Sequence, residues 1–567
     1  MTLRKLLYTT VFFITAGTLS LQAQDKKETD AKAEDKTIAE EIEVVRPYKP
    51  VLAEAVKLRR SPDLSDIKTY KAKYNYGITD RKLELNADIN KLQAQQVADE
   101  RKEQLINNYL KAGLGTSGTT LAEGYFNIGR DEGMQLGGFF KHFGQEGDLN
   151  GQKFNQQQFS VFGRSILDQF TLSGKINYQR NGLYFYGQDV NNTFVNDNPA
   201  KQAFNFFEGE GEIASKYTTD EDALSYAAKI NGYMWGDHYS AKENSVVLNG
   251  YLNKRISSFN LGLAGSVELG NTKDLLVSVN NNLLKLNPYI RLHANGIKIN
   301  AGINFVQEFG DFSSTRIFPS VTADLTLIPD YLQLFGELKG DVQRNSLKGL
   351  TDDNPFLTNN IQIKNTVEKI SFTAGVKGTG GPGFGYKAKV YHKELDNLPF
   401  FVNNFNSPQQ FDVIYEFGKT KLLGVEGELS VQVSNSLKWT GMLNIENYVP
   451  DREAEAWFKP QLKVSSNLLF NFNDKLSFNA AVALQDDSKA KLYSAAPSSP
   501  YVIPNPDTER VVNIKGFVDL GIGASYKINK QFSVFANANN LLDNKNGRFL
   551  YYQAIGFNGF GGLTYSF

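Results

Sequence analysis

The chain has 567 residues, and its 61 Lys plus Arg are balanced by 61 Asp plus Glu, so the formal net charge is zero. This length exceeds an ordinary domain of about 100 to 200 residues but suits one large barrel, and the zero charge excludes a global field that would attract nucleic acid. Cysteine is absent, which excludes thiolate metal sites, thiol catalysis, disulfides and lipoprotein anchoring of the mature N-terminus.

The first residues have the order of a secretory signal peptide. Arg4 and Lys5 precede an apolar run over residues 6–21, and a polar stretch follows it. The run is too short for a stable transmembrane helix, so we expect residues 1–23 to be a signal peptide. No later window has the roughly 18 to 20 uninterrupted apolar residues of a membrane helix. A mature chain that enters a membrane must therefore do so as a closed barrel, in which every backbone group is paired.

Residues 24–105 are expected to form a flexible N-terminal extension or a vestigial plug. From Asp25 to Glu41 the chain is mostly Lys, Glu, Asp, Ala and Thr. Such a composition buries too little apolar surface to offset the entropy of ordering. A short strand-like alternation follows, in Ile42, Glu43, Val44 and Val45.

From about residue 106 the sequence alternates with a period of two. In the run Val512–Ile528 every even position is apolar or Gly, while the odd positions include Asn, Lys, Asp and Ser. The same alternation recurs in Ile297–Phe305, Leu332–Leu338, Leu423–Val433 and Leu476–Leu484. Successive side chains of a strand point to opposite faces, so one face suits lipid and the other suits water. The pattern predicts an all-β membrane protein, a large antiparallel up-and-down transmembrane β-barrel over residues 106–567.

The connections between these runs alternate in length. The short ones carry turn residues, in Asp131-Glu132-Gly133, Asn295-Gly296, Pro329-Asp330, Asn435-Ser436, Asn473-Asp474 and Asn529-Lys530. The long ones lie near residues 187–202, 270–281, 342–363, 396–410, 486–507 and 541–551. This alternation is typical of tight periplasmic turns and extended surface loops, and it predicts about 22 strands, within a range of 16 to 22. A barrel this wide has a lumen that its own wall side chains cannot fill.

The last strand is amphipathic and ends on an aromatic residue. Leu563, Tyr565 and Phe567 share one face of it. A terminal aromatic on such a strand resembles the signal by which the outer-membrane assembly machinery recognises its substrates. These three residues are therefore the candidate insertion signal.

Two stretches of the barrel resemble a known family. Residues 532–543 end in Asn-Asn-Leu-Leu-Asp, and a loop then leads to the closing strand at residues 559–567. This end resembles the C-terminal end of TonB-dependent receptor barrels, where an Asn-Asn-Leu-Phe/Leu-Asp motif precedes a loop and the last strand. Residues 108–127 resemble the start of receptor-like barrels that lack a full plug.

The N-terminal stretch departs from the resemblance in its length but contains a candidate TonB-binding strand. The stretch between the signal peptide and the first strand is too short for the full-length plug domain of such receptors. Ile42, Glu43, Val44 and Val45 are the candidate TonB-box-like strand, which would pair with TonB by edge addition. An ordinary strand or linker is the alternative for these four residues.

A glycine motif near the start of the barrel matches the residue pattern of a dinucleotide-binding fingerprint but not its structural context. Gly113, Gly115 and Gly118 fit G-x-G-x-x-G, but a strand pattern follows them instead of the helix that would face a pyrophosphate. Close packing at the barrel seam is the better interpretation.

No residue pattern predicts catalysis, a cofactor or a metal. The four histidines, His142, His238, His293 and His392, lack the spacing of a metal site. His142 and His392 at presumed strand ends leave a hydrolytic triad as an alternative. Asp352-Asp353 and Asp486-Asp487 are expected to be solvated loop charges. We therefore predict that the chain is not an enzyme.

An apolar group stands in one of the long loops. Phe400, Phe401 and Phe405 lie in a segment that should face solvent. Apolar side chains in a loop favour contact with a partner or a buried fold-back of the loop itself. The three phenylalanines are therefore candidate partner contacts.

Taken together, these patterns predict a cell outer-membrane protein that resembles TonB-dependent receptors and binds or transports a solute. Its expected partners are outer-membrane lipid, the assembly machinery and TonB or another periplasmic or outer-membrane protein, with no nucleic acid. The alternative is a non-transporting accessory or scaffold subunit of an outer-membrane complex that serves assembly or secretion.

Overall fold

The computed structural model describes residues 108–128, 133–189, 194–216, 223–257, 259–294, 296–433, 436–494 and 508–567, and almost all of its regular structure is β-strand. The barrel strands are β1 (Tyr109–Gly115), β2 (Thr120–Ile128), β3 (Met134–Glu146), β4 (Lys153–Ile166), β5 (Phe170–Tyr184), β6 (Lys201–Ser215), β7 (Ser225–Gly236), β8 (Lys242–Ile256), β9 (Phe259–Lys273), β10 (Ser278–Ala294), β11 (Ile297–Gly310), β12 (Ser314–Ile328), β13 (Leu332–Gln343), β14 (Thr366–Thr379), β15 (Phe384–Asp396), β18 (Lys419–Val433), β19 (Leu437–Pro450), β20 (Leu462–Asn471), β21 (Leu476–Gln485), β24 (Phe517–Lys527), β25 (Phe532–Asn539) and β26 (Asn558–Ser566). The connections contain β16 (Pro399–Asn403), β17 (Phe411–Tyr415), β22 (Ser488–Tyr493), β23 (Glu509–Ile514) and the helix α3 (Leu347–Asp353).

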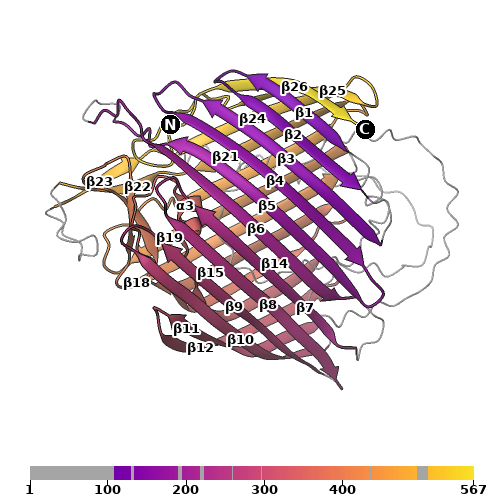
Figure 1. Cartoon of the computed structure of the whole chain (residues 1–567). Helices are drawn as coiled ribbons and strands as arrows, with labels where there is room; N and C mark the ends of the chain where they lie inside the picture. The colour runs from indigo at the N-terminus through magenta and orange to yellow at the C-terminus, as the bar shows by residue number, and fades with distance from the viewer. Residues whose placement is uncertain are drawn as a thin grey trace, which may run out of the picture. The chain divides into compact units, whose positions relative to one another are not determined.

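The strands form one closed antiparallel barrel. Among the described residues the main sheet has 22 strands, each paired with its neighbours along the chain. The first strand closes the ring, because β1 pairs with β2 on one side and with β26 on the other, where Gly113 lies opposite Gly562 (Figure 1). Closure leaves no unpaired edge, as a sheet in lipid requires. The predicted fold class and strand number are confirmed.

The two faces of the wall differ as the alternation predicts. On β18 Leu423 and Val425 are 57% and 40% exposed on the outer face, while Leu422 and Glu426 are 4% and 6% exposed on the inner face. The other barrel strands repeat this pattern, and exposed apolar side chains such as Ile303 of β11 form an outer band. A band of this kind suits lipid and would be an aggregation hazard in water.

The inner wall is polar, and its charges pair across neighbouring strands. Lys393 of β15 contacts Glu368 of β14 at 3.1 Å, and Lys389 of β15 contacts Glu426 of β18 at 2.8 Å. Cross-strand pairs of opposite charge stabilise a sheet and fit a wet lumen. No helix among the described residues is long and apolar enough to span a bilayer.

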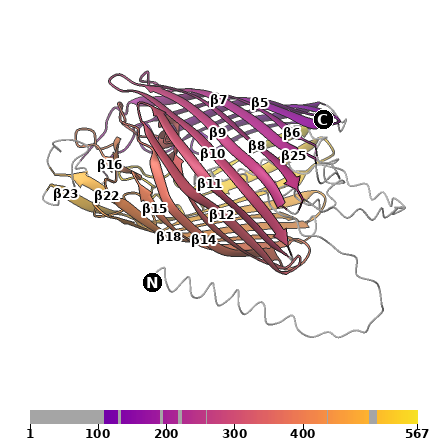
Figure 2. The same ribbon diagram turned by 90° about the horizontal axis from the view of Figure 1, so that it is seen from below.

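Turns at the end that holds both described chain termini are short. The side chain of Asn473 accepts the N–H groups of Lys475 and Leu476, and Asn529 does the same for Gln531 and Phe532. Asn is favoured at such positions because its side chain closes a local ring with the following backbone. At the opposite end several connections are long and carry β16, β17, β22, β23 and α3. Figure 2 labels β16, β22 and β23 at this end.

Two sequence-based boundaries are wrong. The loop expected at residues 270–281 is only the turn 274–277, because β9 and β10 pair as far as Lys273 and Ser278. The run Val512–Ile528 is two strands, β23 and β24, separated near Gly516. A Cβ at Gly516 would lie 2.4 Å from the carbonyl oxygen of Gln485, so the chain passes close to β21 there and bends into a separate hairpin.

Candidate functional site

The loop end of the barrel holds the largest buried apolar cluster of the described residues, which we call the mouth cluster. It combines side chains from the loops with side chains from the loop ends of barrel strands. Its members are Leu183, Phe204, Trp235, Ala241, Leu347, Leu350, Leu357, Ile361, Ile363, Phe400, Phe401, Val402, Phe411, Val413, Ile414, Tyr415, Trp457, Phe458, Ala490, Ile514, Phe549 and Tyr552. Burying one large apolar side chain stabilises by about 1.5 to 3 kcal/mol. The loops therefore hold one another in a defined arrangement.

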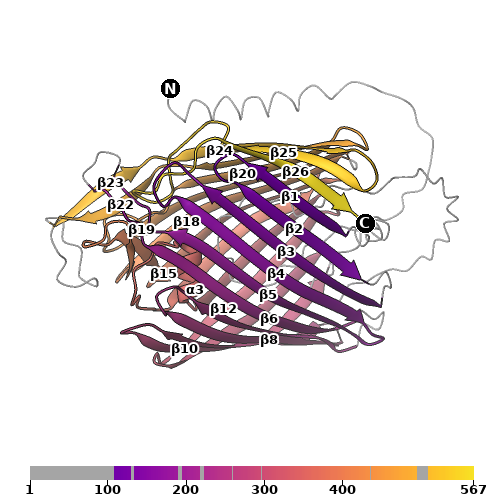
Figure 3. The same ribbon diagram turned by 45° about the horizontal axis from the view of Figure 1, so that its top comes forward.

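The helix α3 lies inside the barrel. On β8 Glu243 and Ser245 are 1% and 3% exposed, whereas Val246, which points to the opposite face of the strand, is 44% exposed. The two polar residues therefore face the lumen. The N–H of Leu347 donates to the Glu243 carboxylate at 2.6 Å, and the Arg344 guanidinium donates to the Ser245 hydroxyl. These contacts attach the start of α3 to the inner wall, and Figures 1 and 3 show the helix behind the near strands.

Local sequence explains why this segment becomes helical. The Ser346 hydroxyl accepts the N–H of Gly349 at 3.0 Å and caps the helix. Capping by Ser satisfies one of the free N–H groups of the first turn. Leu347 and Leu350 are buried on one side of the helix. A Ser followed by two leucines three residues apart is the sequence signal for α3, and a period-two strand pattern does not reveal it.

A second set of contacts fastens the remainder of the 344–365 segment to the wall. Asn281 of β10 donates to the Asn345 carbonyl at 3.3 Å and to the Asn365 side chain at 2.7 Å. Asn365 in turn donates to Glu308 of β11 at 2.8 Å. Buried polar groups are stable only when paired in this way. The segment is therefore held at both ends by the lumen wall.

The β22–β23 hairpin is joined to the loop between β19 and β20 by a buried ion pair. The Lys491 ammonium is 2.9 Å from Glu453 and 2.7 Å from Glu509, and its side chain is 2% exposed. The indole N–H of Trp457 donates to the same Glu453 carboxylate at 2.7 Å. Charges so deeply buried fix a geometry, because each one needs its partner.

Aromatic rings connect the loops that the ion pair does not reach. Phe356 stacks on Tyr552 with ring centroids 3.6 Å apart, and Tyr186 meets Tyr552 edge-on at 4.9 Å. Phe411 lies 5.4 Å from Phe549. Burial raises the pKa of the Tyr186 phenol to about 12, so this ring stays neutral at physiological pH. Four loops far apart in sequence thus share one aromatic core.

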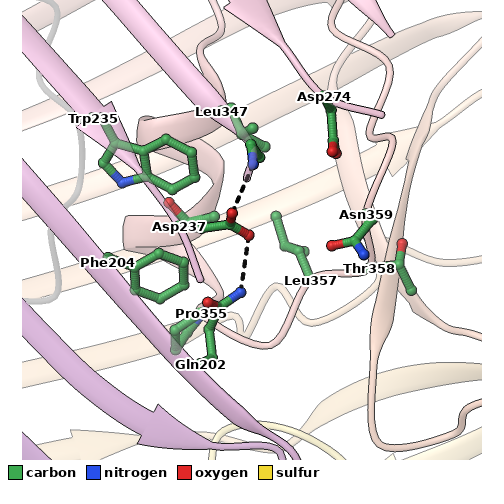
Figure 4. Close-up of a pocket in the computed structure, with 12 residues that line it drawn as sticks. Gln202, Phe204, Trp235, Asp237, Asp274, Leu347, Pro355, Leu357, Thr358 and Asn359 are labelled. Carbon is green, nitrogen blue, oxygen red and sulfur yellow. Dashed lines mark hydrogen bonds between the residues drawn. The ribbon is translucent and has the colours of Figure 1, made fainter. Parts of the chain in front are cut away.

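A narrow cleft lies beside this core, and its roughly 270 Å³ of empty space includes open solvent. Phe204, Trp235 and Leu357 are among its apolar lining residues, and Asp237 and Asp274 are among its polar ones (Figure 4). The Asp237 carboxylate accepts the N–H of Ala241 at 2.8 Å and the Gln202 amide at 3.2 Å. Burial raises the pKa of Asp237, and these hydrogen bonds oppose the rise. The cleft is therefore a narrow and largely polar recess beside the mouth cluster.

The three candidate loop phenylalanines are split by the fold. Phe400 and Phe401 are 0% and 4% exposed in the mouth cluster, which is the buried fold-back that the sequence left open. They are therefore not available to a partner in this arrangement, because the β16–β17 hairpin turns them inward. Phe405 is 38% exposed at the hairpin tip, and its contact with a partner stays a prediction.

The candidate insertion signal lies on the outer face. Leu563 and Phe567 are 57% and 50% exposed, and the Tyr565 and Phe567 rings stack at 5.6 Å. Aromatic rings at this height suit a membrane interface. Recognition by the assembly machinery stays a prediction. The signal peptide, residues 24–105 as a unit and the strand-like residues Ile42, Glu43, Val44 and Val45 lie outside the described residues.

The histidines considered for a hydrolytic triad are placed differently from the prediction. His142 and His392 lie within β3 and β15, not at strand ends. Neighbours opposite His392, Phe372 and Leu423, are 54% and 57% exposed on the outer face. Among the described residues, His142 contacts the side chains of Thr120 and Gln157 and forms no hydrogen bond or ion pair with a carboxylate. Both rings therefore project from the outer side of the wall, away from the lumen.

The other motifs have structural roles. Gly113 and Gly115 lie at the seam, where a Cβ on Gly115 would be 2.3 Å from the Gly559 carbonyl oxygen. The strand β2 follows them, so the segment has no helix for a phosphate. Asp352 pairs with Lys348 at 2.6 Å, and Asp487 accepts the N–H of Gly516 at 2.7 Å.

Comparison with solved structures finds the same fold in iron-uptake receptors. The ferric enterobactin receptor of Pseudomonas aeruginosa is 13% identical, with a TM-score of 0.56, over 81% of this chain and 80% of that chain. The siderophore receptor PirA from Acinetobacter baumannii is 12% identical, with a TM-score of 0.58 over 81% and 80%. The FrpB iron transporter from Neisseria meningitidis is 9% identical, with a TM-score of 0.60 over 81% of each chain.

At these identities the solved structures show the fold alone. A search of curated proteins finds no match. The family model described as "TonB dependent receptor-like, beta-barrel" matches residues 62–541, which is most of the chain. Members of this family are outer-membrane receptors and not enzymes, and the chain belongs to the TonB-dependent receptor-like β-barrel family.

Proposed function

We propose that the chain is an outer-membrane receptor that binds a solute at its loop end and moves it across the outer membrane with energy from TonB. The observation that carries the proposal is the mouth cluster, which joins loops of a receptor-family barrel beside a narrow cleft with fixed carboxylates. A scaffold would need an exposed docking face more than an ordered lumen. Transport uses the lumen itself.

The arrangement of the loops implies that transport needs a conformational change. The 344–365 segment is bonded to the inner wall through Glu243, Asn281 and Glu308. While it stays attached, the segment occupies part of the lumen and narrows the path of a solute. Energy from a periplasmic partner would serve to release it.

The proposed coupling element is the strand formed by Ile42, Glu43, Val44 and Val45. An extended segment pairs with a partner's sheet edge through its backbone N–H groups, and proline removes that donor. A pull-down with the TonB periplasmic domain should retain the wild-type chain and lose the V44P/V45P variant. The matched control A31P/A33P, in the charged leader, should bind like wild type.

The result decides between the leading function and its rival. Equal retention of V44P/V45P and wild type would contradict the coupling role of this strand. A chain that TonB does not retain, and that instead co-purifies with other outer-membrane proteins, would favour an accessory subunit.

A further inference from the structure

Three cationic side chains meet beside the mouth cluster. Lys463 stands at the loop end of β20, opposite Asn444 of β19 and Gln485 of β21. Asn444 and Gln485 are 8% and 4% exposed, while Ile445 on the alternate face is 42% exposed. Because paired residues point to the same side of a sheet, Lys463 faces the lumen.

The other two cations are brought there by a ring contact between distant loops. Phe458 and Phe549, both in the mouth cluster, have ring centroids 5.7 Å apart. Lys459 follows the first ring and Arg548 precedes the second, with the guanidinium carbon 5.1 Å from the Phe549 centroid. Lys459 and Arg548 also act electrostatically on Lys463. Three positive charges from two loops and one strand therefore share one region.

These cations differ from several other lysines of the inner wall. Lys285, Lys389 and Lys393 each have a carboxylate within about 3.1 Å. In the part of the chain that the structure describes, no salt bridge or side-chain hydrogen bond is found for Lys459, Lys463 or Arg548, although all three are partly buried. A buried cation without a hydrogen-bonded partner is costly.

Two carboxylates lie near the three cations. Glu446 is hydrogen-bonded to two tyrosines, and Asp353 belongs to the helix α3, whose release the proposed transport requires. Glu446 accepts hydrogen bonds from the hydroxyls of Tyr391 at 2.8 Å and Tyr448 at 3.1 Å. Asp353, the last residue of α3, acts on Lys459 and Arg548 through space. Burial lowers the pKa of Lys459 and Arg548, and Asp353 opposes that effect. The region keeps an excess positive charge.

We propose that Lys459, Lys463 and Arg548 form a binding site for an anionic solute that bears carboxylate or phosphate oxygens, with Asp353 as the internal counter-ion that the solute replaces. The proposal rests on the proposed function and names the solute class. Charge-assisted hydrogen bonds from ammonium and guanidinium groups are the strongest such contacts. Replacement of Asp353 would remove an attraction that holds the end of α3, so binding and release of the lumen segment are coupled.

The test uses the full chain, purified in detergent, and isothermal titration calorimetry with citrate and with inorganic phosphate as probes. Citrate should bind more tightly than phosphate, because it offers three carboxylates. The K459Q/R548Q variant should bind citrate at least about tenfold more weakly, the factor that one lost strong contact accounts for. The matched control K489Q removes a lysine of the neighbouring hairpin that already pairs with Glu455, and it should bind like wild type.

The variant D353N distinguishes loss of the proposed site from a general charge effect and from misfolding. Loss of the competing counter-ion should tighten citrate binding several-fold, a gain that an unfolded protein does not give. No heat of binding with either probe, equal weakening in K489Q, or weaker binding in D353N would each overturn the proposal. TonB pull-down tests the proposed function separately, so failure of one does not imply failure of the other.

Discussion

Single buried charges decide how the loop end is held together. Lys491 is enclosed between Glu453 and Glu509, whose side chains are 7% and 12% exposed. Removal of one partner from a buried ion pair leaves an uncompensated charge, which costs about 3 to 5 kcal/mol. An exposed pair contributes far less because solvent screens it.

The substitution Lys491→Met should therefore destabilise the loop end. We expect a loss of about 3 kcal/mol in the free energy of unfolding and faster proteolysis within the β22–β23 hairpin. The matched control is Lys545→Met, because Lys545 and Asp148 form an exposed pair at 3.4 Å. Equal stability of the two variants in urea titrations would show that the buried pair has no structural role.

Asp412 supplies a pH-dependent prediction. Its carboxylate accepts hydrogen bonds from Thr358 at 2.7 Å and Asn404 at 2.8 Å, and burial raises its pKa above the ordinary 3.8. A raised folded pKa means that the folded state binds the proton more tightly than the unfolded state. This group therefore adds stability as the pH falls through the raised pKa toward 3.8, and the gain is absent at neutral pH.

The substitution Asp412→Asn should remove this contribution. The urea midpoint of wild type minus that of D412N should rise as the pH is lowered from 7 toward about 4. The exposed Asp352 provides the control, since D352N should leave the pH dependence of wild type unchanged. A difference between wild type and D412N that is constant with pH would contradict the raised pKa.

At the scale of elements, the local patterns were predictable and the loop contacts were not. The alternation in residues 297–305 and the turns at Asn473 and Asn529 each depend on a few neighbouring residues, so sequence alone located them. The strand β23 has the same alternation as a barrel strand, so the sequence pattern predicts a single strand over Val512–Ile528. The contacts of Lys491 with Glu453 and of Arg548 with its neighbours depend on loop packing over long sequence separations, which no local pattern encodes.

The closing strand β26 is expected to direct assembly of the barrel. Its outward residues Leu563, Tyr565 and Phe567 are the proposed insertion signal, and Phe567 contributes few contacts that the folded barrel needs, because it is half exposed. F567A should slow barrel assembly into outer-membrane vesicles without changing the stability of the assembled barrel. F557A, an exposed phenylalanine of the preceding loop, should assemble at the wild-type rate. Equal rates for both variants would refute the signal.

In the molecule as a whole, the width of the barrel requires that something other than the wall side chains fills its lumen. A lumen bounded by 22 strands is too wide for wall side chains to fill. The chain supplies α3, two hairpins and the aromatic loops to its own loop end, and these elements pack into one cluster. We therefore expect these loops to close the barrel at this end.

Conductance across a planar lipid bilayer tests this account most directly. The full chain should show little conductance, and a variant without Leu347–Asp353 should conduct even though residues 24–105 are intact. Removal of residues 24–105 alone should not open the barrel. An open pore in the full chain, or an unchanged closed state after removal of Leu347–Asp353, would contradict closure of the lumen by the loops.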